Sequence, residues 1–282
     1  MTLRLAPILQ DVAGRLAGRP AGARRADPVA WAYALRDAAA LARPGVLVSH
    51  LDPALEAHAL RAALPGGDDW VDRLTGARPL AQVEPAVGAV ELVRTLVGAQ
   101  RGSGMAVAAT LSGPCSVAAR VAGELGVGDD ADDHVELADL VADALAGLVG
   151  AYADAGADPI VVVEEDVAFV PADERAAVHA PLVRAISHHR REGVLWWPAC
   201  FGGRRPTGYD ASALPWDGDG DPPPGPALRL APSSWAGDPA AVAARWPGLL
   251  SAAGAAGATL VLSDGPLPAD VPPENLGAGA PG

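Results

Sequence analysis

The chain has 282 residues and a mass of 28.4 kDa, enough for one sizeable hydrophobic core, so we expect a single domain over residues 1–282. A formal net charge of −13 argues against nucleic-acid binding, and the absence of lysine excludes mechanisms that need a lysine Schiff base. No stretch reaches the roughly 20 apolar residues of a membrane span, and two cysteines are too few for a disulfide framework. We therefore expect a soluble, cytoplasmic protein that acts on a small molecule.

Short apolar runs predict buried parallel strands along most of the chain. Residues 1–45 are rich in alanine and predict helices without a convincing strand. After them, apolar runs bounded by turn residues or helical segments fall at 46–49, 105–111, 160–163, 194–197, 227–231 and 259–262. Because these runs alternate with helical segments, their order predicts right-handed parallel crossovers, which are typical of an α/β fold.

The clearest helix lies between the second and third of these strands. Its apolar face is formed by residues at helical spacing: Leu137, Val141, Leu145, Leu148 and Tyr152. Asp133 and Glu136 predict the N-terminal cap of this helix, and Gly156 predicts its end. A last helix is predicted to begin at Asp238-Pro239 and to break or kink at Pro247.

Two segments depart from the alternating pattern. Residues 202–226 are rich in glycine, proline and aspartate and predict a loop, with residues 209–214 as the remnant of a strand. Residues 279–282 predict a frayed tail. The fold class that we predict is a TIM (β/α)8-like barrel, irregular or incomplete over residues 1–45 and 202–226.

The predicted strand at 160–163 is followed directly by three acids, Glu164, Glu165 and Asp166. Buried parallel strands that carry polar groups at their C-terminal ends are how α/β barrels build active sites. The alternation of side chains along a strand points Glu165 to the opposite side from its two neighbours. We therefore predict that one of the acids enters a site and that the others bind arginine or water.

Three further candidates follow other predicted strands. His50 is a candidate substrate-binding residue, and its alternative is a solvated loop histidine. Cys200 is a candidate catalytic thiol, and its alternative is a small buried hydrophobic residue. Asp264 is a candidate catalytic acid, and its alternative is a loop carboxylate that bonds to the backbone near Gly265.

Three segments resemble a known enzyme superfamily. Residues 111–118, with the turn Gly113-Pro114, are similar to the Gly-Pro-x-Thr turn that follows a barrel strand in uroporphyrinogen decarboxylases and their methyltransferase relatives. Residues 152–160 resemble the step from helix to strand in these enzymes. Residues 272–278 resemble their Thr-Pro-Pro-Glu-Asn-x-x-Ala segment, with Val271 in place of the threonine. The three segments occur in the order that the superfamily has.

The resemblance implies a (β/α)8 barrel with its site at the C-terminal ends of the strands, and one of two chemistries. The decarboxylases remove carboxyl groups without metal or cofactor. The methylcobamide:coenzyme M methyltransferases, like cobalamin-independent methionine synthase, activate a thiol on zinc held by a His-x-Cys pair and a further cysteine. Here Pro198 stands in place of the histidine and Asp264 in place of the further cysteine, and proline offers a metal no side-chain donor. We expect no cofactor, and zinc is disfavoured.

Two hypotheses about function stay open. The first is an enzyme of lyase or methyltransferase type that acts on a small acidic substrate. Its candidate catalytic residues are Asp264, Glu164, Glu165 and Cys200, and its candidate substrate-binding residues are His50, Asp166 and Arg120. Arg120 falls near the position of a superfamily tyrosine and could anchor an anion. The second hypothesis is a catalytically degenerate barrel that acts as a binding or partner subunit.

We predict that the protein does not decarboxylate uroporphyrinogen. That substrate carries many carboxylates, whereas this acidic chain has no lysine and no clear counterpart of the arginine-rich substrate loop of the decarboxylases. An assay for coproporphyrinogen formation by the purified protein tests the prediction. Turnover that disappears in Asp264→Ala would show that the prediction is wrong and would restore the decarboxylase assignment.

Overall fold

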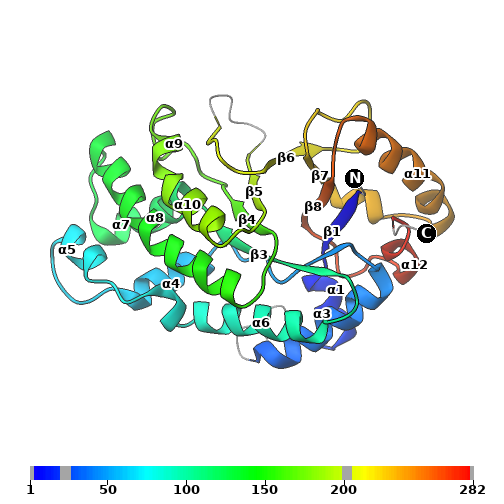
Figure 1. Cartoon of the computed structure of the whole chain (residues 1–282), viewed down its shortest axis with the longest axis horizontal. Helices are drawn as coiled ribbons and strands as arrows, with labels where there is room; N and C mark the ends of the chain where they lie inside the picture. Colours follow the sequence, from blue (N-terminus) through cyan, green and yellow to red (C-terminus); the bar gives the residue numbers. More distant parts are fainter. Residues whose placement is uncertain (1–2, 20–26, 199–204, 280–282) are drawn as a thin grey trace.

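The computed structural model describes residues 3–19, 27–198 and 205–279 and shows a TIM-type (β/α)8 barrel (Figure 1). All hydrogen-bonded strand pairs are parallel, in the order β1-β8-β7-β6-β5-β4-β3-β2. The strands are β1 (Arg4–Ile8), β2 (Val46–Val48), β3 (Ala106–Ser112), β4 (Ile160–Val163), β5 (Gly193–Trp196), β6 (Ala211–Trp216), β7 (Ala227–Leu230) and β8 (Leu260–Pro266). The predicted fold class is confirmed.

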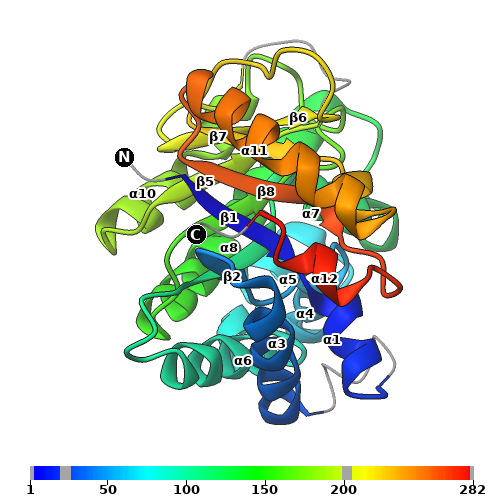
Figure 2. The same ribbon diagram turned by 90° about the vertical axis from the view of Figure 1, so that its right-hand side faces the viewer.

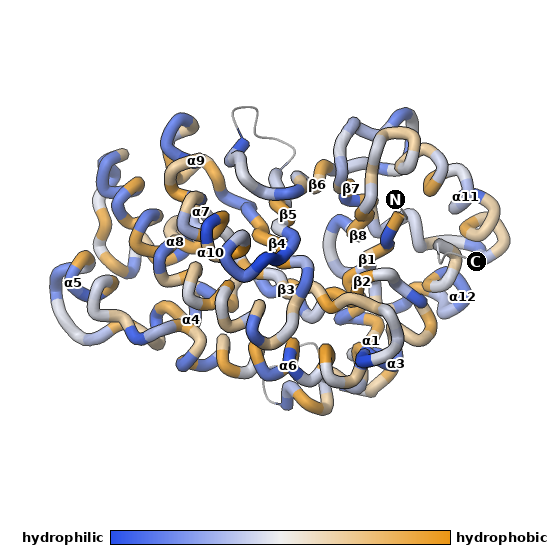
Figure 3. Tube along the Cα trace, in the orientation of Figure 1, coloured by the Kyte–Doolittle hydropathy of each residue, from blue (hydrophilic) through white to orange (hydrophobic). Residues whose placement is uncertain are grey.

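Helices cover the outside of the barrel, with alternating hydrophobic and hydrophilic segments along several of them (Figure 3). They are α1 (Gln10–Leu16), α3 (Pro28–Ala42), α4 (Leu55–Ala63), α5 (Trp70–Thr75), α6 (Ala86–Ala99), α7 (Pro114–Leu125), α8 (Ala131–Asp154), α9 (Arg175–Val178), α10 (Ala180–His188), α11 (Pro239–Ala255) and α12 (Pro273–Leu276). Two short 3-10 helices, η1 (Leu80–Gln82) and η2 (Pro232–Trp235), complete the layer. No helix in the described part of the chain is long and apolar enough to cross a membrane.

The first and last strands in sequence lie side by side, as Figure 2 shows for β1 and β8. Strands β1 and β2, at the two ends of the hydrogen-bonded order, contact each other and bring the barrel nearly to closure. A side chain bridges this seam: Gln10, just after β1, accepts a hydrogen bond of 2.9 Å from the backbone N–H of Leu51, just after β2. The seam is therefore held at the end of the barrel where the strands terminate.

Alternation along the strands separates the barrel interior from the helix layer. In β4, Val161 and Val163 belong to the interior cluster, whereas Ile160 and Val162 pack with the helices. The interior cluster consists mainly of small and β-branched residues, with Trp196 as its one large aromatic residue. Small side chains leave room for the strands to lie close together around the barrel interior. The charged groups described below follow the same alternation between the interior and the helix layer.

The structure corrects several sequence-based predictions. The segment 1–45 contains strand β1, which pairs with β8; Ala6 and Ile8 are buried in the barrel interior, and Leu5 is buried on the opposite side, among the helices. Helix α8 begins earlier than predicted: the side chain of Asp130, not the pair Asp133 and Glu136, accepts a bond from the first turn. The Asp238 cap of α11 is confirmed, but the helix continues through Pro247 to Ala255 without a break.

The predictions for residues 202–226 and for the tail at 279–282 agree with the structure to different degrees. Residues 211–216 form β6, which extends beyond the predicted remnant, and residues 217–226 form a loop in place of a helix. Gly279, predicted to be frayed, is buried beside Leu5 and Trp246, while residues 280–282 lie outside the described part of the chain.

Asn275, in the Pro-Pro-Glu-Asn segment, is buried and donates to the backbone carbonyls of Trp235 and Gly237. These two hydrogen bonds therefore hold the chain between η2 and α11 in place against the Pro-Pro-Glu-Asn segment.

Candidate functional site

A cavity of about 830 Å³ opens at the end of the barrel where the strands terminate. We call it the mouth cavity. Residues from the ends of β1, β2, β4, β5, β6, β7 and β8 line it: Gln10, Leu51, Pro53, Glu164, Glu165, Trp196, Pro198, Pro215, Arg229, Asp264, Gly265 and Pro266. Pockets of this volume accommodate small molecules, and this end of a TIM barrel is where active sites are found. The mouth cavity is the candidate active site.

A buried ion pair forms part of its wall. Arg229 in β7 and Asp264 in β8 both occupy inward-facing positions, and Arg229 Nη1 donates to Asp264 Oδ1 at 3.0 Å. Arg229 also donates from Nη2 to the carbonyl of Trp197 and lies 4.7 Å from the ring centroid of Trp196. Burial lowers the pKa of Arg229 and the Asp264 carboxylate opposes that shift, and a guanidinium remains charged in proteins. Among the described lining residues, Arg229 therefore gives the mouth cavity a fixed positive charge.

Asp264 and Arg229 differ in their exposure to the cavity. The Asp264 side chain is 35% exposed and the Arg229 side chain only 6%. The guanidinium Nε of Arg229 is buried and has no hydrogen-bond partner in the described structure. A carboxylate that is partly open and held by a cation can accept a proton from a ligand, and the guanidinium retains N–H groups that can bind an anion.

Glu164 borders the mouth cavity, but its side chain is buried in the helix layer. The residue follows Val163, and its side chain turns toward the N-terminus of α7 with an exposed fraction of 1%. Its carboxylate accepts hydrogen bonds from the backbone N–H of Cys115 at 3.1 Å, the N–H of Ser116 at 2.9 Å and the Ser116 hydroxyl at 2.5 Å. A carboxylate from another strand thus caps the positive end of this helix.

The close approach of Glu164 depends on a glycine. A Cβ atom on Gly113, the residue before α7, would lie only 2.2 Å from Glu164 Oε1. The backbone of Gly113 is extended, with φ of −75° and ψ of 165°, so glycine is needed here for space. This requirement gives the Gly113-Pro114 turn, recognised in the sequence, a physical role.

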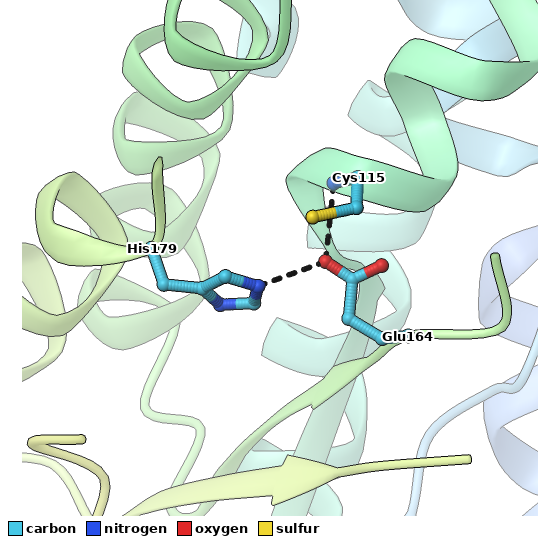
Figure 4. Close-up of side chains that lie close together, drawn as sticks. All are labelled: Cys115, Glu164 and His179. Atoms are coloured by element: carbon cyan, nitrogen blue, oxygen red, sulfur yellow. Dashed lines mark hydrogen bonds and ion pairs between the residues drawn. The ribbon is translucent and has the colours of Figure 1, made fainter. Parts of the chain in front are cut away.

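Histidine and cysteine side chains surround the same carboxylate (Figure 4). His179, at the junction of α9 and α10, places Nε2 3.0 Å from Glu164 Oε1, and its Nδ1 lies 2.9 Å from the Tyr209 hydroxyl. Cys115, at the start of α7, is buried next to them. Burial, with the Glu164 charge adding to it, raises the pKa of the Cys115 thiol far above its ordinary value. The thiol is therefore protonated when no cation is bound.

The remaining two acids of the cluster lie at the surface. Glu165 forms an ion pair with Arg120, which also donates to the carbonyl of Pro53 at 2.7 Å. Asp166 is exposed, and its backbone N–H and that of Glu165 both donate to the Ser116 hydroxyl. Glu165 lines the mouth cavity, as the alternation along β4 predicts. Arg120 is engaged by a carboxylate, so its role as an anion anchor stays a prediction.

A second cluster of buried polar side chains includes Glu56 of helix α4. The imidazole of His50 is 2.9 Å from the Ser49 hydroxyl and 3.5 Å from the Tyr152 hydroxyl. Glu56 is buried nearby, and desolvation raises its pKa to about 7. Its Oε2 atom has no hydrogen-bond partner in the described structure. The described lining of the mouth cavity does not include His50, so the structure places this sequence candidate outside that lining.

Of the positions that would hold zinc in the resembling methyltransferases, the two that the structure describes are poorly suited to that metal. Pro198 lines the mouth cavity and has no side-chain donor, and Asp264 Oδ1 already accepts a hydrogen bond from Arg229. Cys200, the third position, lies outside the described residues. Within the described ranges, the group of His, Cys, Asp and Glu side chains close enough to share a metal is Cys115, Glu164 and His179.

Sequence reasoning missed Arg229, Ser116, His179 and Tyr209 as members of these clusters. A signal was available for Arg229, because one charged residue inside the apolar run 227–231 must find a buried partner. His179 and Tyr209 carry no such signal, since they lie in segments between strands and reach Glu164 only through the tertiary fold.

Comparison with known proteins shows similarity at the level of structure. The sequence matches no known family model, and no curated protein matches it. Among solved structures, a methyltransferase from Methanosarcina mazei superposes with a TM-score of 0.69 at 14% sequence identity. The alignment covers 97% of this chain and 91% of the methyltransferase chain. At this identity the similarity establishes the shared fold.

Replacing Gly113 by alanine should destabilise the protein by about 2–4 kcal/mol, because the new methyl group must push the Glu164 carboxylate away from its buried donors. Denaturant unfolding measures the change. Gly123→Ala, at an exposed position of the same helix with open space around it, is the matched control and should stabilise by about 0.5–1 kcal/mol. Equal effects of the two substitutions would contradict the role given to Gly113.

Glu56→Gln should change the pH dependence of stability. A folded-state pKa of about 7, above the ordinary value of 4.5, means that the folded protein binds the proton more tightly than the unfolded chain. The free energy of unfolding of the wild type then falls as pH rises from about 4.5 to 7. The variant should therefore gain stability relative to the wild type, by up to about 3 kcal/mol between pH 5 and pH 8. A difference between the two proteins that is constant over this range would contradict the raised pKa.

Proposed function

We propose that this chain is a methyl-transfer enzyme of the barrel class that acts on a small acidic substrate in the mouth cavity. The observation that carries the proposal is the Arg229–Asp264 pair, which places a cation and a partly open carboxylate on the wall of a cavity of about 830 Å³. The structural similarity to a methyltransferase from Methanosarcina mazei supports the reaction class. The two observations are independent of each other.

Arg229 is the residue that would bind the acidic group of the substrate. Its guanidinium is held in place by the Trp197 carbonyl, the Asp264 carboxylate and the face of Trp196. A cation held in a fixed orientation loses little conformational entropy when it binds a carboxylate or sulfonate. Since the protein has a net charge of −13, an anion needs such a local site to bind at all.

Asp264 is the residue that would handle the proton. When a methyl group is transferred to a thiol or another X–H acceptor, the bond between the methyl carbon and its donor breaks and leaves its electron pair on the donor. The new bond to carbon forms, and the acceptor loses its proton. The carboxylate lies on the cavity wall and is 35% exposed, so it can take that proton as a general base. Glu164 is less suited to this role, because its carboxylate oxygens already accept three hydrogen bonds from the start of α7.

Decarboxylation of a small acid is the second candidate reaction, and the same ion pair favours it. In that reaction a carboxylate leaves as carbon dioxide and a proton takes its place on carbon. Arg229 would hold the carboxylate and Asp264, once protonated, would supply the proton. The cavity wall offers one buried guanidinium among its lining residues, which suits a substrate with few carboxylates.

The test is methyl transfer from methylcobalamin to 3-mercaptopropionate or 2-mercaptoethanesulfonate, followed by mass spectrometry of the thioether. We expect product with the wild type, and at least a tenfold loss of kcat/KM in Arg229→Met, which keeps most of the side-chain volume but removes the charge. Arg245→Met is the control, because Arg245 binds backbone carbonyls near η2 and does not line the mouth cavity. Calorimetric titration of the same thiols measures binding separately from turnover.

The results of these assays distinguish methyl transfer from decarboxylation and from binding without catalysis. Binding that depends on Arg229, without transfer, would indicate a barrel that binds the ligand but has lost catalysis. Loss of a carboxyl group from a small acid, detected as carbon dioxide and abolished in Asp264→Asn, would favour the lyase reaction. Binding that is unchanged in Arg229→Met would show that the proposed anion site is wrong.

A further inference from the structure

Cys115, Glu164 and His179 form a buried group that the proposed function does not use. Their ligand atoms, one from each side chain, all lie within 4.8 Å of one another. They come from three separate parts of the fold: the start of α7, the end of β4 and the junction of α9 and α10 (Figure 4). Cys115 and His179 are fully buried and Glu164 is 1% exposed. Sulfur, nitrogen and oxygen donors of these kinds are the ligands that zinc has in proteins.

The state of His179 supplies an independent observation. Its Nε2 atom is buried and has no hydrogen-bond partner among the described residues, although Glu164 Oε1 lies only 3.0 Å away. The distance suits an ion pair, but the two groups are not aligned for a hydrogen bond. A fully buried ring nitrogen that faces a carboxylate oxygen and a sulfur atom without a hydrogen-bond partner can serve as a ligand for a cation.

The other nitrogen of the ring is positioned as zinc-binding histidines require. Nδ1 lies 2.9 Å from the Tyr209 hydroxyl. When Nδ1 donates its proton to that oxygen, Nε2 carries a lone pair and faces the negative Glu164. Two acceptors 3.0 Å apart repel each other unless a proton or a metal cation lies between them. Histidine ligands of metals commonly donate their second N–H to a neighbouring acceptor in this way.

We propose that Cys115, Glu164 and His179 form a binding site for one Zn²⁺ ion, with Tyr209 as the residue that orients His179. Tetrahedral zinc with bonds of 2.0–2.3 Å places its ligand atoms about 3.3–3.6 Å apart, so shifts below about 1 Å would complete the site. The Cys115 thiol loses its proton to solvent as the sulfur–zinc bond forms. The positive charge of Arg175 favours the thiolate form of Cys115. Arg175 donates a hydrogen bond to the Val170 carbonyl, and it forms no ion pair with Glu164 among the described residues.

This site is distinct from the positions of Pro198, Cys200 and Asp264, which correspond to the zinc ligands of the resembling methyltransferases. Glu164 lines the mouth cavity as well as the cluster, so the zinc ion would lie directly behind the cavity wall. The inference does not depend on methyl transfer, because it rests only on the three ligand side chains and on the state of the His179 Nε2 atom.

The experiment uses the full-length variant Cys200→Ser, in which Cys115 is the single remaining cysteine. The protein is stripped of metal with a chelator and titrated with Zn²⁺ and, separately, with Co²⁺. We expect one Zn²⁺ per chain by elemental analysis, and a Co²⁺ complex with an intense thiolate-to-cobalt absorption band in the near ultraviolet. Since only Cys115 can supply that thiolate, the spectrum identifies the ligand without a change at the site itself.

Variants of the site then test the other positions. His179→Gln should reduce zinc affinity at least tenfold, and Tyr209→Phe should reduce it by roughly ten- to a hundredfold. His188→Gln, at the exposed end of α10, should leave the affinity unchanged. Circular dichroism checks that each variant is folded. The proposal is wrong if Cys200→Ser takes up no Zn²⁺, if its Co²⁺ complex lacks the thiolate band, or if His179→Gln binds zinc as tightly as its parent.

Discussion

The Glu164 carboxylate at the N-terminus of α7 is the interaction on which this end of the barrel depends. Through backbone and side-chain donors it joins β4 to the turn that follows β3, and through His179 it reaches the junction of α9 and α10. Removing an ion from water is costly, and here the cost is offset by three hydrogen bonds and the positive end of a helix. The arrangement has room only because Gly113 has no side chain.

The mouth cavity is built around that fixed point. Glu165, the next residue, turns to the cavity and to Arg120, while the backbone of both exposed acids is held by the Ser116 hydroxyl. On the far side, Arg229 and Asp264 pair across β7 and β8 above the ring of Trp196. The wall therefore carries charges of both signs at fixed positions, which favours binding a polar small molecule in one orientation.

The sequence predicted the polar strand ends well and their partners poorly. The acids after β4 and Asp264 in β8 lie at one end of the sheet, because parallel strands must end on the same side. The direction of Glu164 was harder to predict, since its place in the helix layer depends on a helix N-terminus that no local pattern links to it. Strand β1 was missed because five residues in an alanine-rich segment carry too little signal.

The sequence by itself determined the parallel order of strands and helices after residue 45, the loop at residues 217–226, the cap at Asp238 and the position of chemical groups at strand ends. These features rest on periodicity, turn residues and local hydrogen bonds, which act over a few residues. Only the tertiary structure decided that Cys115, Glu164 and His179 meet, and that Arg229 faces Asp264. Contacts between residues 15 to 64 positions apart depend on strand register and helix packing, which a single sequence does not encode locally.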